Sequence, residues 1–262
     1  MGPREQEILD AIALKGSLEV LELAELLGVS DQTVRRLVKP LAARGLLKKV
    51  HGAVMATARY SDSPFQERML VRQAAKRALA NRVLALVRNG DSLLLDTGST
   101  TAYIAQALRQ RRDLVVVTNS SSIASTLASV PGNRVFMAGT ELRNHDGASF
   151  DASAFATLRR FSARLAILSA AAVNAARGFQ VQEHCEADLA ACMLAQADQA
   201  LMAIDSSKFG KTALVQLPAF TKPASLVSEQ APPAALIAAL RKTAAPGLRI
   251  CCEAPPPGDR AK

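Results

Sequence analysis

The sequence predicts an α/β protein in which a small winged helix-turn-helix precedes a larger, Rossmann-like domain with a mostly parallel sheet. Residues 1–57 contain three short stretches with helical spacing of apolar residues, followed by a hairpin pattern. From residue 76 onward, short apolar runs alternate with helical segments, which is typical of parallel strands covered on both faces. The apolar fraction of 49% is enough to build a core and excludes wholesale disorder.

The first two predicted helices have clear apolar faces. Apolar residues keep helical spacing over 8–13 and again over 21–27. Gly28 then breaks the second pattern and suits the C-terminus of a helix. Ser30 suits the N-cap of the next helix, so a tight turn is expected between the second and third helices.

The third helix is expected to begin at Asp31 and to be closed by Gly45. Residues 46–54 are expected to follow as a two-stranded wing that turns near Gly52. Three helices with a tight turn before the third, and then a wing, describe a winged helix-turn-helix.

Charge is distributed unevenly over this first domain. Residues 1–31 hold two basic and seven acidic side chains, whereas residues 32–52 hold six basic and no acidic ones. A basic third helix and wing are the electrostatic footprint of a surface that contacts DNA phosphates, although an ordinary solvated basic helix is the alternative. The net charge of +9 also favours an anionic partner. The expected DNA-binding residues are Gln32, Thr33, Arg35, Arg36, Lys39, Lys48, Lys49 and His51.

The rest of the chain divides by composition. Residues 58–75 are expected to be a linker, 76–253 an effector-sensing and oligomerisation domain, and 254–262 a flexible tail. The expected strands of the second domain contain residues 93–95, 114–117, 135–138, 165–168 and 200–204.

Polar clusters follow several of these strands, and ligands of open parallel sheets bind beyond the carboxyl ends of the strands. The hydroxyls and helix N–H groups that follow Asp96 can hold a phosphate, although a capped helix start has the same composition. Asp96 itself is either an internal hydrogen-bonding residue or a binder of sugar hydroxyls. The expected effector-binding residues are Asp96, Gly98, Ser99, Thr100, Thr101, Asn119, Ser120 and Lys208.

Several classes of protein are disfavoured. Without Trp and with only 4% aromatic residues, a platform that stacks single-stranded bases is not expected. No apolar run reaches the roughly 20 residues of a membrane span, and no signal peptide is seen. The four cysteines lack metal-ligand spacing, and no nucleophile elbow, Walker loop or Gly-x-Gly-x-x-Gly motif occurs. The expectation is a cytoplasmic protein with no catalytic residue, cofactor, metal or membrane partner.

Several motifs occur in a fixed order along nearly the whole chain. In the first part they are Ser30-Asp-Gln-Thr33-Val-Arg35-Arg36, Gly45-Leu46-Leu47 and Val50-His51-Gly52. In the second part they are Leu95-Asp96-Thr-Gly-Ser-Thr-Thr101, Val117-Thr118-Asn119-Ser120, Ala138-Gly139-Thr140-Glu141-Leu142-Arg143, Asp146-Gly147, Glu186 and Asp205-Ser206-Ser207-Lys208-Phe209-Gly210. Together they resemble the DeoR family of bacterial transcriptional regulators. The spacing from Glu186 to Lys208 and the tail Ala231-Pro232-Pro233 are most similar to the glycerol-3-phosphate repressor branch.

The resemblance implies a repressor of a carbohydrate or polyol operon. Such a protein binds double-stranded operator DNA as a homo-oligomer, a dimer or a tetramer, and a phosphorylated sugar or polyol releases it. Glycerol 3-phosphate is the first candidate effector. The resemblance also implies that the effector domain is related to ribose-5-phosphate isomerase.

The chain departs from the family pattern in both domains. Leu37 stands where an Asp is usual, and Pro40 is expected to kink or end the third helix early because an interior proline removes a backbone donor. In the second domain, usual glycines are replaced by Thr140, Asp151 and Ala172, and a usual Asp is Asn174. Whether these changes alter or abolish the response to an effector is left open by the sequence.

Two other functions remain open at this stage. One is a sugar-phosphate isomerase or lyase, in which Asp96, Glu186, or Asp205 with Lys208 would supply the acid–base chemistry. The other is a DNA-binding protein with a degenerate effector pocket, whose second domain only oligomerises. Ligand-induced release from DNA distinguishes the repressor from the last of these, and turnover of ribose 5-phosphate would reveal the enzyme.

Overall fold

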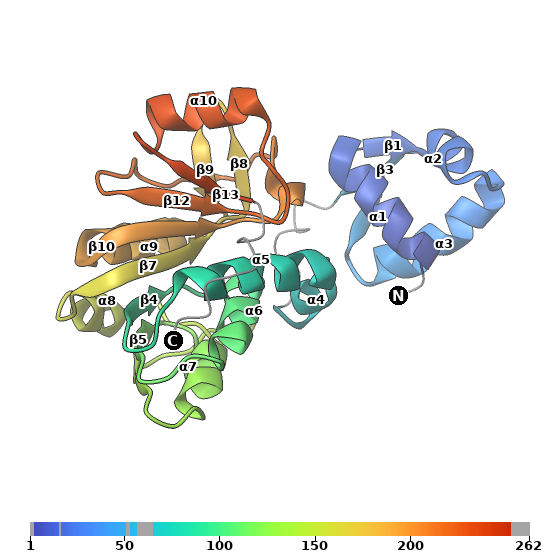
Figure 1. Cartoon of the computed structure of the whole chain (residues 1–262). Helices are drawn as coiled ribbons and strands as arrows, with labels where there is room; N and C mark the ends of the chain where they lie inside the picture. Colours follow the sequence, from blue (N-terminus) through green and yellow to red (C-terminus); the bar gives the residue numbers. More distant parts are fainter. Residues whose placement is uncertain (1–2, 16, 51–52, 57–64, 253–262) are drawn as a thin grey trace. The chain divides into compact units, whose positions relative to one another are not determined.

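The computed structural model describes residues 3–15, 17–50, 53–56 and 65–252. These residues fall into two compact units, Met1–Pro64 and Phe65–Lys262 (Figure 1). The first unit contains three helices and a small antiparallel sheet of strand order β1-β3-β2. Its elements are α1 (Pro3–Lys15), β1 (Ser17–Glu19), α2 (Val20–Leu27), α3 (Asp31–Ala43), β2 (Leu47–Val50) and β3 (Ala53–Ala56).

The predicted winged helix-turn-helix is confirmed, with one strand more than expected. β2 pairs with β3 as the predicted wing, with Val50 opposite Ala53. The three-residue strand β1, which was not predicted, pairs with the other side of β3. The turn expected near Gly52 lies outside the described residues. Ile8, Leu23 and Leu41 are fully buried in a core that belongs to this unit alone.

Both ends of α3 have the predicted caps. The Ser30 side chain accepts a hydrogen bond from the Thr33 N–H at 3.3 Å, which satisfies one of the free donors of the first turn. Gly45 has a φ of 71°, and beyond it the Leu46 N–H donates to the Leu41 carbonyl at 3.0 Å. This bond closes the helix as a left-handed glycine cap does.

Of the two outcomes expected at Pro40, a kink or an early end of the helix, the early end is wrong, because α3 continues to Ala43. A proline at this position removes the donor that would bond the carbonyl of Arg36. Both residues are exposed, so water can reach that carbonyl. The Arg44 N–H donates to the Pro40 carbonyl at 3.1 Å, which carries the helix past the proline.

The second unit is built on a seven-stranded sheet of order β13-β12-β10-β7-β4-β5-β6, in which every neighbouring pair is parallel. The five predicted strands are confirmed, and two strands at one end of the sheet, β12 and the edge strand β13, are additional. The strands are β4 (Ser92–Leu95), β5 (Val115–Thr118), β6 (Arg134–Met137), β7 (Ala163–Ser169), β10 (Ala197–Ala203), β12 (Ala224–Val227) and β13 (Arg249–Cys251).

Helices cover both faces of this sheet, as the continuous apolar strands predict. Along β4, Leu93 and Leu95 pack with the helices α5, α6 and α7, whereas Leu94 belongs to the core of the other face. The helices are α4 (Phe65–Leu70), α5 (Gln73–Leu86), α6 (Ser99–Leu108), α7 (Ser121–Ala128), α8 (Ala152–Leu158), α9 (His184–Gln196), the short η1 (Ser206–Lys208) and α10 (Ala234–Thr243).

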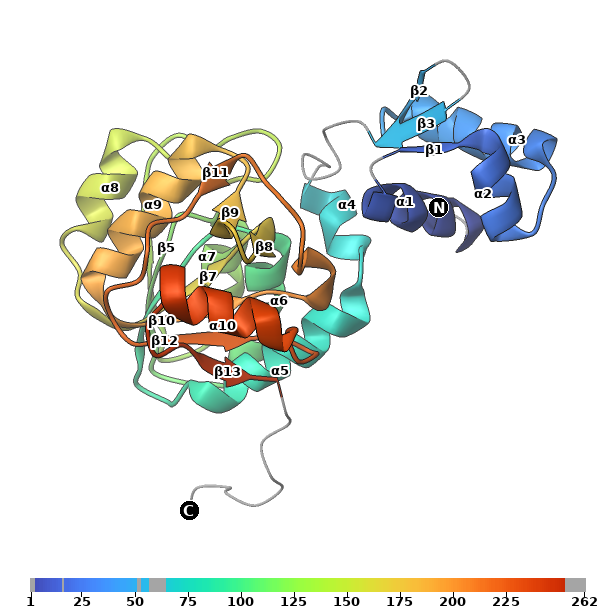
Figure 2. The ribbon, with the colours of Figure 1, turned by 90° about the horizontal axis from the view of Figure 1, so that it is seen from above.

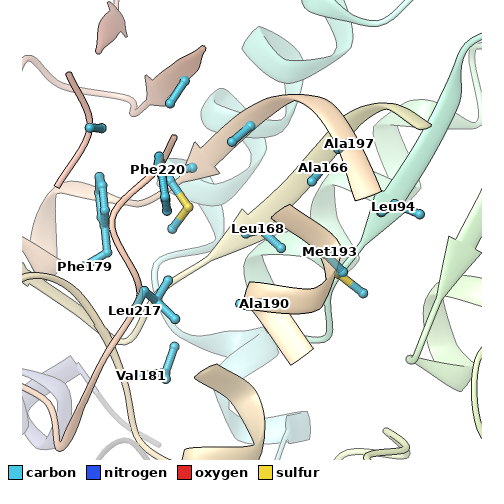
Figure 3. Packing of buried hydrophobic residues seen from close by; sticks show 14 of the residues in the cluster. Leu94, Ala166, Leu168, Phe179, Val181, Ala190, Met193, Ala197, Leu217 and Phe220 are labelled. Atoms are coloured by element: carbon cyan, nitrogen blue, oxygen red, sulfur yellow. The ribbon is translucent and has the colours of Figure 1, made fainter. Parts of the chain in front are cut away.

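A small antiparallel sheet of order β11-β9-β8 was not predicted. Its strands are β8 (Ala172–Asn174), β9 (Gly178–Val181) and β11 (Val215–Gln216). Figure 2 shows β9 beside α9 and α10, which it contacts. Phe179 of β9 stacks on Phe220 with ring centroids 5.4 Å apart, in the core drawn in Figure 3. The small sheet therefore extends the core on this side.

The predicted linker extends too far along the chain. Residues 65–75 form α4 and the beginning of α5 within the second unit. Phe65 is buried, and its N–H donates to the carbonyl of His145 at 3.3 Å. Burial of this aromatic ring attaches α4 to the second unit. The remaining residues of the predicted linker, 58–64, and the predicted tail, 254–262, lie outside the described residues.

Candidate functional site

Basic and polar side chains line one face of α3. Val34, Val38 and Leu41 are buried in the core of the first unit, so the opposite face is open. Arg35 forms an exposed ion pair with Asp31 at 3.7 Å, which is too solvated to hold the guanidinium in place. Of the predicted contact residues, Gln32, Arg35, Arg36 and Lys39 are exposed and Thr33 is half-buried.

The predicted wing contacts are described less fully. The backbone of Lys48 and Lys49 lies in β2, but their side chains and the whole of His51 lie outside the described residues. Their part in DNA binding stays a prediction.

In the second unit, the polar loops meet where the direction of strand crossover reverses, between β4 and β7. Asp96 follows β4, and its Oδ2 accepts a hydrogen bond from the Ser169 N–H at the end of β7, at 2.8 Å. Gly98 is required by this close approach, because a Cβ there would lie 2.8 Å from the Ser169 Oγ. A reversal point of this kind is where open parallel sheets bind ligands.

Unpaired buried polar atoms gather at this edge of the sheet. Asp96 Oδ1, Thr97 Oγ1, Asn119 Oδ1 and Ser149 Oγ are buried and have no hydrogen-bond partner among the described residues. Asn119 and Ser149 lie together, because the Asn119 Nδ2 donates to the Ser149 carbonyl at 3.1 Å. Each buried unpaired group costs about 1–3 kcal/mol, so four in one region favour a ligand that supplies the missing partners.

Next to these atoms, the N-terminus of α6 offers donors. The first helical bond runs from the Ala102 N–H to the Gly98 carbonyl, so the N–H groups of Ser99, Thr100 and Thr101 have no acceptor within the helix. All three residues are buried. Such a helix start favours an anion through its free donors and its partial positive charge.

Lys76 adds a full positive charge there, and sequence reasoning missed it. It lies in α5, is 5% exposed, and its ammonium group donates to the Ser99 Oγ at 2.9 Å and to the Arg68 carbonyl at 2.5 Å. Burial lowers the pKa of Lys76 to about 8, against the attraction of Asp205 and with the help of the charge of Lys208. A buried lysine with a lowered pKa gains most from an anionic ligand.

Lys208 approaches the same region from η1, which follows β10. Burial lowers the pKa of Lys208, while the negative charge of Asp205 opposes this effect. The positive charge of Lys208 lowers the pKa of Lys76, and Asp205 attracts both lysines, so the two lysines lie on the same side of the site. Two lysines and a helix start together suit a phosphate.

The pKa of Asp96 is raised well above its usual value. Burial of the carboxyl group is the main cause and the negative charge of Glu186 adds to it, whereas the hydrogen bond from the Ser169 backbone opposes it. A ligand hydroxyl that donates to the unpaired Oδ1 would counteract the cost of burying this carboxylate.

Two of the predicted residues serve the loops themselves. The Thr101 hydroxyl donates to the Gly98 carbonyl at 3.0 Å, and the Ser120 Oγ is paired with the Ser122 Oγ at 3.1 Å. Both residues are fully buried. Their side chains therefore stabilise the starts of α6 and α7.

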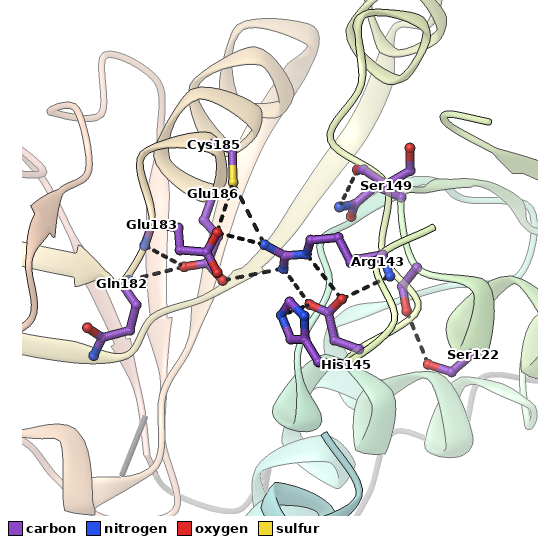
Figure 4. A network of polar contacts seen from close by, with 12 residues as sticks. Ser122, Arg143, His145, Ser149, Gln182, Glu183, Cys185 and Glu186 are labelled. Carbon is purple, nitrogen blue, oxygen red and sulfur yellow. Dashed lines mark hydrogen bonds and ion pairs between the residues drawn. The ribbon is translucent and has the colours of Figure 1, made fainter. Parts of the chain in front are cut away.

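Figure 4 shows an arginine-centred network at the same edge of the sheet. Arg143, in the loop after β6, pairs with Asp146 and with Glu183, the latter at 2.9 Å. Its guanidinium lies 4.1 Å from the centroid of the Phe150 ring. Glu186 accepts the N–H of Glu183 at 3.1 Å and caps α9. The network stabilises the loop between β6 and α8, which also contains Ser149, the residue whose carbonyl accepts the hydrogen bond from Asn119.

The unusual residues Thr140 and Asp151 contact each other. Asp151 Oδ2 accepts the N–H of Thr140 at 2.9 Å, the Thr140 hydroxyl at 2.8 Å and the N–H of Glu141 at 2.9 Å. Its Oδ1 accepts the N–H of Ala154 at 2.8 Å, which caps α8. Hydrogen bonds from Ser153 and from these backbone groups hold the pKa of Asp151 below its usual range. Thr140 and Asp151 therefore stabilise the loop after β6 through these hydrogen bonds.

Asn174 also has a local role. Its Oδ1 accepts the N–H groups of Ala176 and Arg177, at 3.1 and 2.8 Å, in the turn between β8 and β9. Ala172 is buried in β8. Neither residue is a partner of the unpaired atoms near Asp96.

No helix in the described part of the chain is long and apolar enough to cross a membrane. Nor do the described residues include a group of three or more His, Cys, Asp or Glu that could hold a metal ion.

Comparison with protein-family models finds two matches. Residues 4–59 match the DeoR-like helix-turn-helix domain, and residues 71–230 match the DeoR C terminal sensor domain. The second match alone covers more than half of the chain.

Whole-length relatives agree with these matches. The chain is 30% identical over 234 residues to the HTH-type transcriptional repressor CsqR of Escherichia coli (strain K12), covering 89% of this chain and 90% of the relative. It is 25% identical over 237 residues to the glycerol-3-phosphate regulon repressor of the same strain, covering 90% and 94%. Among solved structures it is similar to ribose 5 phosphate isomerase A from Neisseria gonorrhoeae, with 17% identity, a TM-score of 0.38, and coverage of 51% of this chain and 52% of that chain.

Proposed function

The chain belongs to the DeoR family of helix-turn-helix transcriptional repressors, and on this basis we propose that it represses a carbohydrate or polyol operon and is released from DNA by a phosphorylated sugar or polyol. The observation that carries the proposal is the pairing of two subsites. Lys76, Lys208 and the free N–H groups of α6 suit a phosphate, and beside them lie the unpaired acceptors of Asp96 and Asn119.

The two subsites define the orientation of the ligand. Its phosphate would lie against Ser99, Thr100 and the two lysines, where positive charge is concentrated. Its hydroxyls would donate to Asp96 Oδ1 and Asn119 Oδ1, the acceptors that have no partner among the described residues. Glycerol 3-phosphate is the first candidate, because a relative at 25% identity is named for the glycerol-3-phosphate regulon.

The DNA-binding surface is the exposed face of α3, which carries Gln32, Arg35, Arg36 and Lys39. The N-terminal half of a recognition helix faces base edges in the major groove, and Thr33 lies there too. Lys48, Lys49 and His51 would contact phosphates from the wing.

A single recognition helix reads too few base pairs for useful specificity, so we propose that the protein is a homo-oligomer, a dimer or a tetramer. Sedimentation equilibrium of the full chain would reveal this oligomeric state.

We also propose that the protein is not an enzyme and acts in the cytoplasm. Two of the three carboxylates considered for isomerase chemistry are engaged, since Asp205 accepts the Ser207 N–H at 3.1 Å and Glu186 accepts the N–H groups of Gln182 and Glu183. A DNA partner and four free cysteines suit the cytoplasm. Incubation with ribose 5-phosphate should yield no ketose; measurable turnover would contradict this.

The proposal is tested with a panel of named compounds. Operator DNA is first selected by the full-length protein from a random duplex pool. Glycerol 3-phosphate, ribose 5-phosphate and fructose 6-phosphate are then compared with glycerol, ribose, fructose and inorganic phosphate for thermal stabilisation and DNA release. At 100 times its dissociation constant, an effector should stabilise the protein by about 2.7 kcal/mol. If none of the phosphorylated compounds binds at millimolar concentration, the proposed function is wrong.

The affinity for the effector should depend on pH in a defined direction. Because the pKa of Lys76 is about 8, this lysine loses its charge in the free protein as the pH rises above 8. The phosphate monoester is already a dianion above pH 7, so its own charge does not change there. The Kd should therefore rise by about 15-fold in total between pH 8 and 9.5, with a slope that approaches tenfold per pH unit at the upper end. Titration calorimetry measures this, with circular dichroism as the control for folding, and a constant Kd over that range would contradict it.

A further inference from the structure

The residue between α4 and α5 has an unusual backbone. Arg72 has φ 51° and ψ 41°, the left-handed conformation, at the N-cap of α5. Among the described residues other than glycine, just Arg72 and Asp113 have a positive φ. An arginine gains nothing locally from this conformation, which its Cβ disfavours, so surrounding contacts must maintain it.

Those contacts come from the side chain. The Arg72 Nε lies 3.4 Å from the carboxylate of Asp205, which follows β10. Its Nη2 lies 3.4 Å from the carboxylate of Glu229, which follows β12, and donates to the Ser206 Oγ at 3.1 Å. One guanidinium therefore bridges the ends of two neighbouring strands, as the fork of an arginine allows and a lysine does not.

Both carboxylates are held in place from their own side. Asp205 is 2% exposed and accepts the Ser207 N–H at 3.1 Å. Glu229 accepts the Ser206 N–H at 3.0 Å and the Ser228 hydroxyl at 3.1 Å. The anionic side of the bridge is thus rigid, so movement would occur at Arg72 and the α4–α5 junction.

The carboxylate of Asp205 belongs both to the bridge with Arg72 and to the surroundings of the two lysines of the effector site. Asp205 attracts Lys76 and Lys208 as well as Arg72, and the positive charge of Arg72 acts on both lysines. The backbone is shared too, because the Lys76 N–H donates to the Arg72 carbonyl at 3.1 Å, within the first turn of α5. A dianion that pairs with the two lysines would replace Asp205 as their partner, so that Asp205 would interact mainly with Arg72. The dianion would also add negative charge nearby. Both effects attract the guanidinium more strongly.

Building on the proposed effector site, we propose that Arg72 is a positioning residue that couples the effector to DNA binding. Arg72 lies two residues after Leu70, the end of α4, and α4 is the first element that follows the DNA-binding unit along the chain. Effector binding stabilises the Arg72–Asp205–Glu229 bridge and with it the strained junction.

The test compares coupling with affinity. Coupling is the ratio of the Kd for the selected operator with and without saturating glycerol 3-phosphate, typically about 5- to 150-fold in allosteric proteins. In Arg72→Ala this ratio should fall to within about threefold of one, while the operator Kd without effector stays within about threefold of the parent. Arg109→Ala, which removes an exposed arginine at the far end of α6, is the matched control and should keep the parent ratio.

Two further measurements exclude a merely structural effect. Glu229→Gln should lower the coupling like Arg72→Ala, and the double variant should lose no more than either single one, as expected for residues that act as a pair. Without any ligand, backbone amides of residues 70–76 should exchange hydrogen faster in both single variants than in the parent. If the parent responds and Arg72→Ala responds equally, or if amide exchange is unchanged, the inference is wrong. If the parent itself responds to no phosphorylated compound, the proposed function fails first.

Discussion

Replacing Lys76 by methionine should abolish DNA release by the effector while leaving DNA binding intact. The substitution removes the ammonium group that reaches Ser99 at the start of α6 and keeps a side chain of similar length. Charge-assisted hydrogen bonds to a phosphate are worth about 1.5–3 kcal/mol each, so the effector Kd should rise by roughly 100-fold. Fluorescence anisotropy of labelled operator against effector concentration measures the loss.

The variant should fold, because methionine relieves the cost of burying a charge that lowers the pKa of Lys76. A melting temperature equal to or above that of the parent would confirm this. Lys242→Met, which changes an exposed lysine in the last turn of α10, is the matched control and should behave like the parent. If Lys76→Met still released DNA at the parent's effector concentration, the phosphate would lie elsewhere.

The second large effect is expected on DNA. Arg35→Ala and Arg36→Ala should each weaken operator binding by about 1–3 kcal/mol if the arginine contacts a guanine edge, and together they should cost at least about 30-fold. Both side chains are exposed on α3, so the free energy of unfolding should change by less than about 0.5 kcal/mol.

Selection from a random duplex pool distinguishes the two kinds of contact. Loss of a base contact relaxes the preferred sequence, whereas loss of a phosphate contact weakens binding to every sequence and reduces the salt dependence. Arg112→Ala, which removes an exposed arginine of the second unit, serves as the control. Parent-like binding by the double variant would show that this face of α3 does not contact DNA.

Local signals in the sequence were sufficient where a backbone group needs a specific partner. Ser30 and Gly45 marked the two ends of α3, because a capping oxygen and a left-handed residue are local requirements. Continuous apolar runs such as 165–168 identified central strands, since both faces of those strands are buried. Pro40 misled the prediction because its cost depends on whether the freed carbonyl is exposed, which is a property of the folded unit.

The missed elements depend on contacts between distant segments. β1 has three residues and exists because β3 offers it an open edge. β9 and β11 pair across more than 30 residues, and nothing in their own sequences requires that register. Phe65 was assigned to a linker because the neighbouring residues are charged, and its burial was visible only in the structure.

Lys76 shows how a site residue escapes sequence reasoning. A lysine on a helix is usually solvated, so its presence there does not by itself indicate a site. A signal was nevertheless present, since Leu79, Ala80 and Val83 continue the buried face of α5 on which Lys76 lies. The presence of Lys76 at an otherwise apolar position of an amphipathic helix therefore indicates a buried charge, as expected at a site that binds an anion. Thr97 and Ser149 gave no such signal, because their unpaired hydroxyls result from the meeting of separate loops.

The separate cores of the two units have a consequence for the evolution of this protein. The core around Leu23 and Leu41 includes no residue of the second unit, and the two cores of the sheet include none of the first. Mutations that change which DNA sequence is read can therefore accumulate without disturbing the packing around the ligand, and the reverse also holds. Gene fusion could join either unit to a new counterpart.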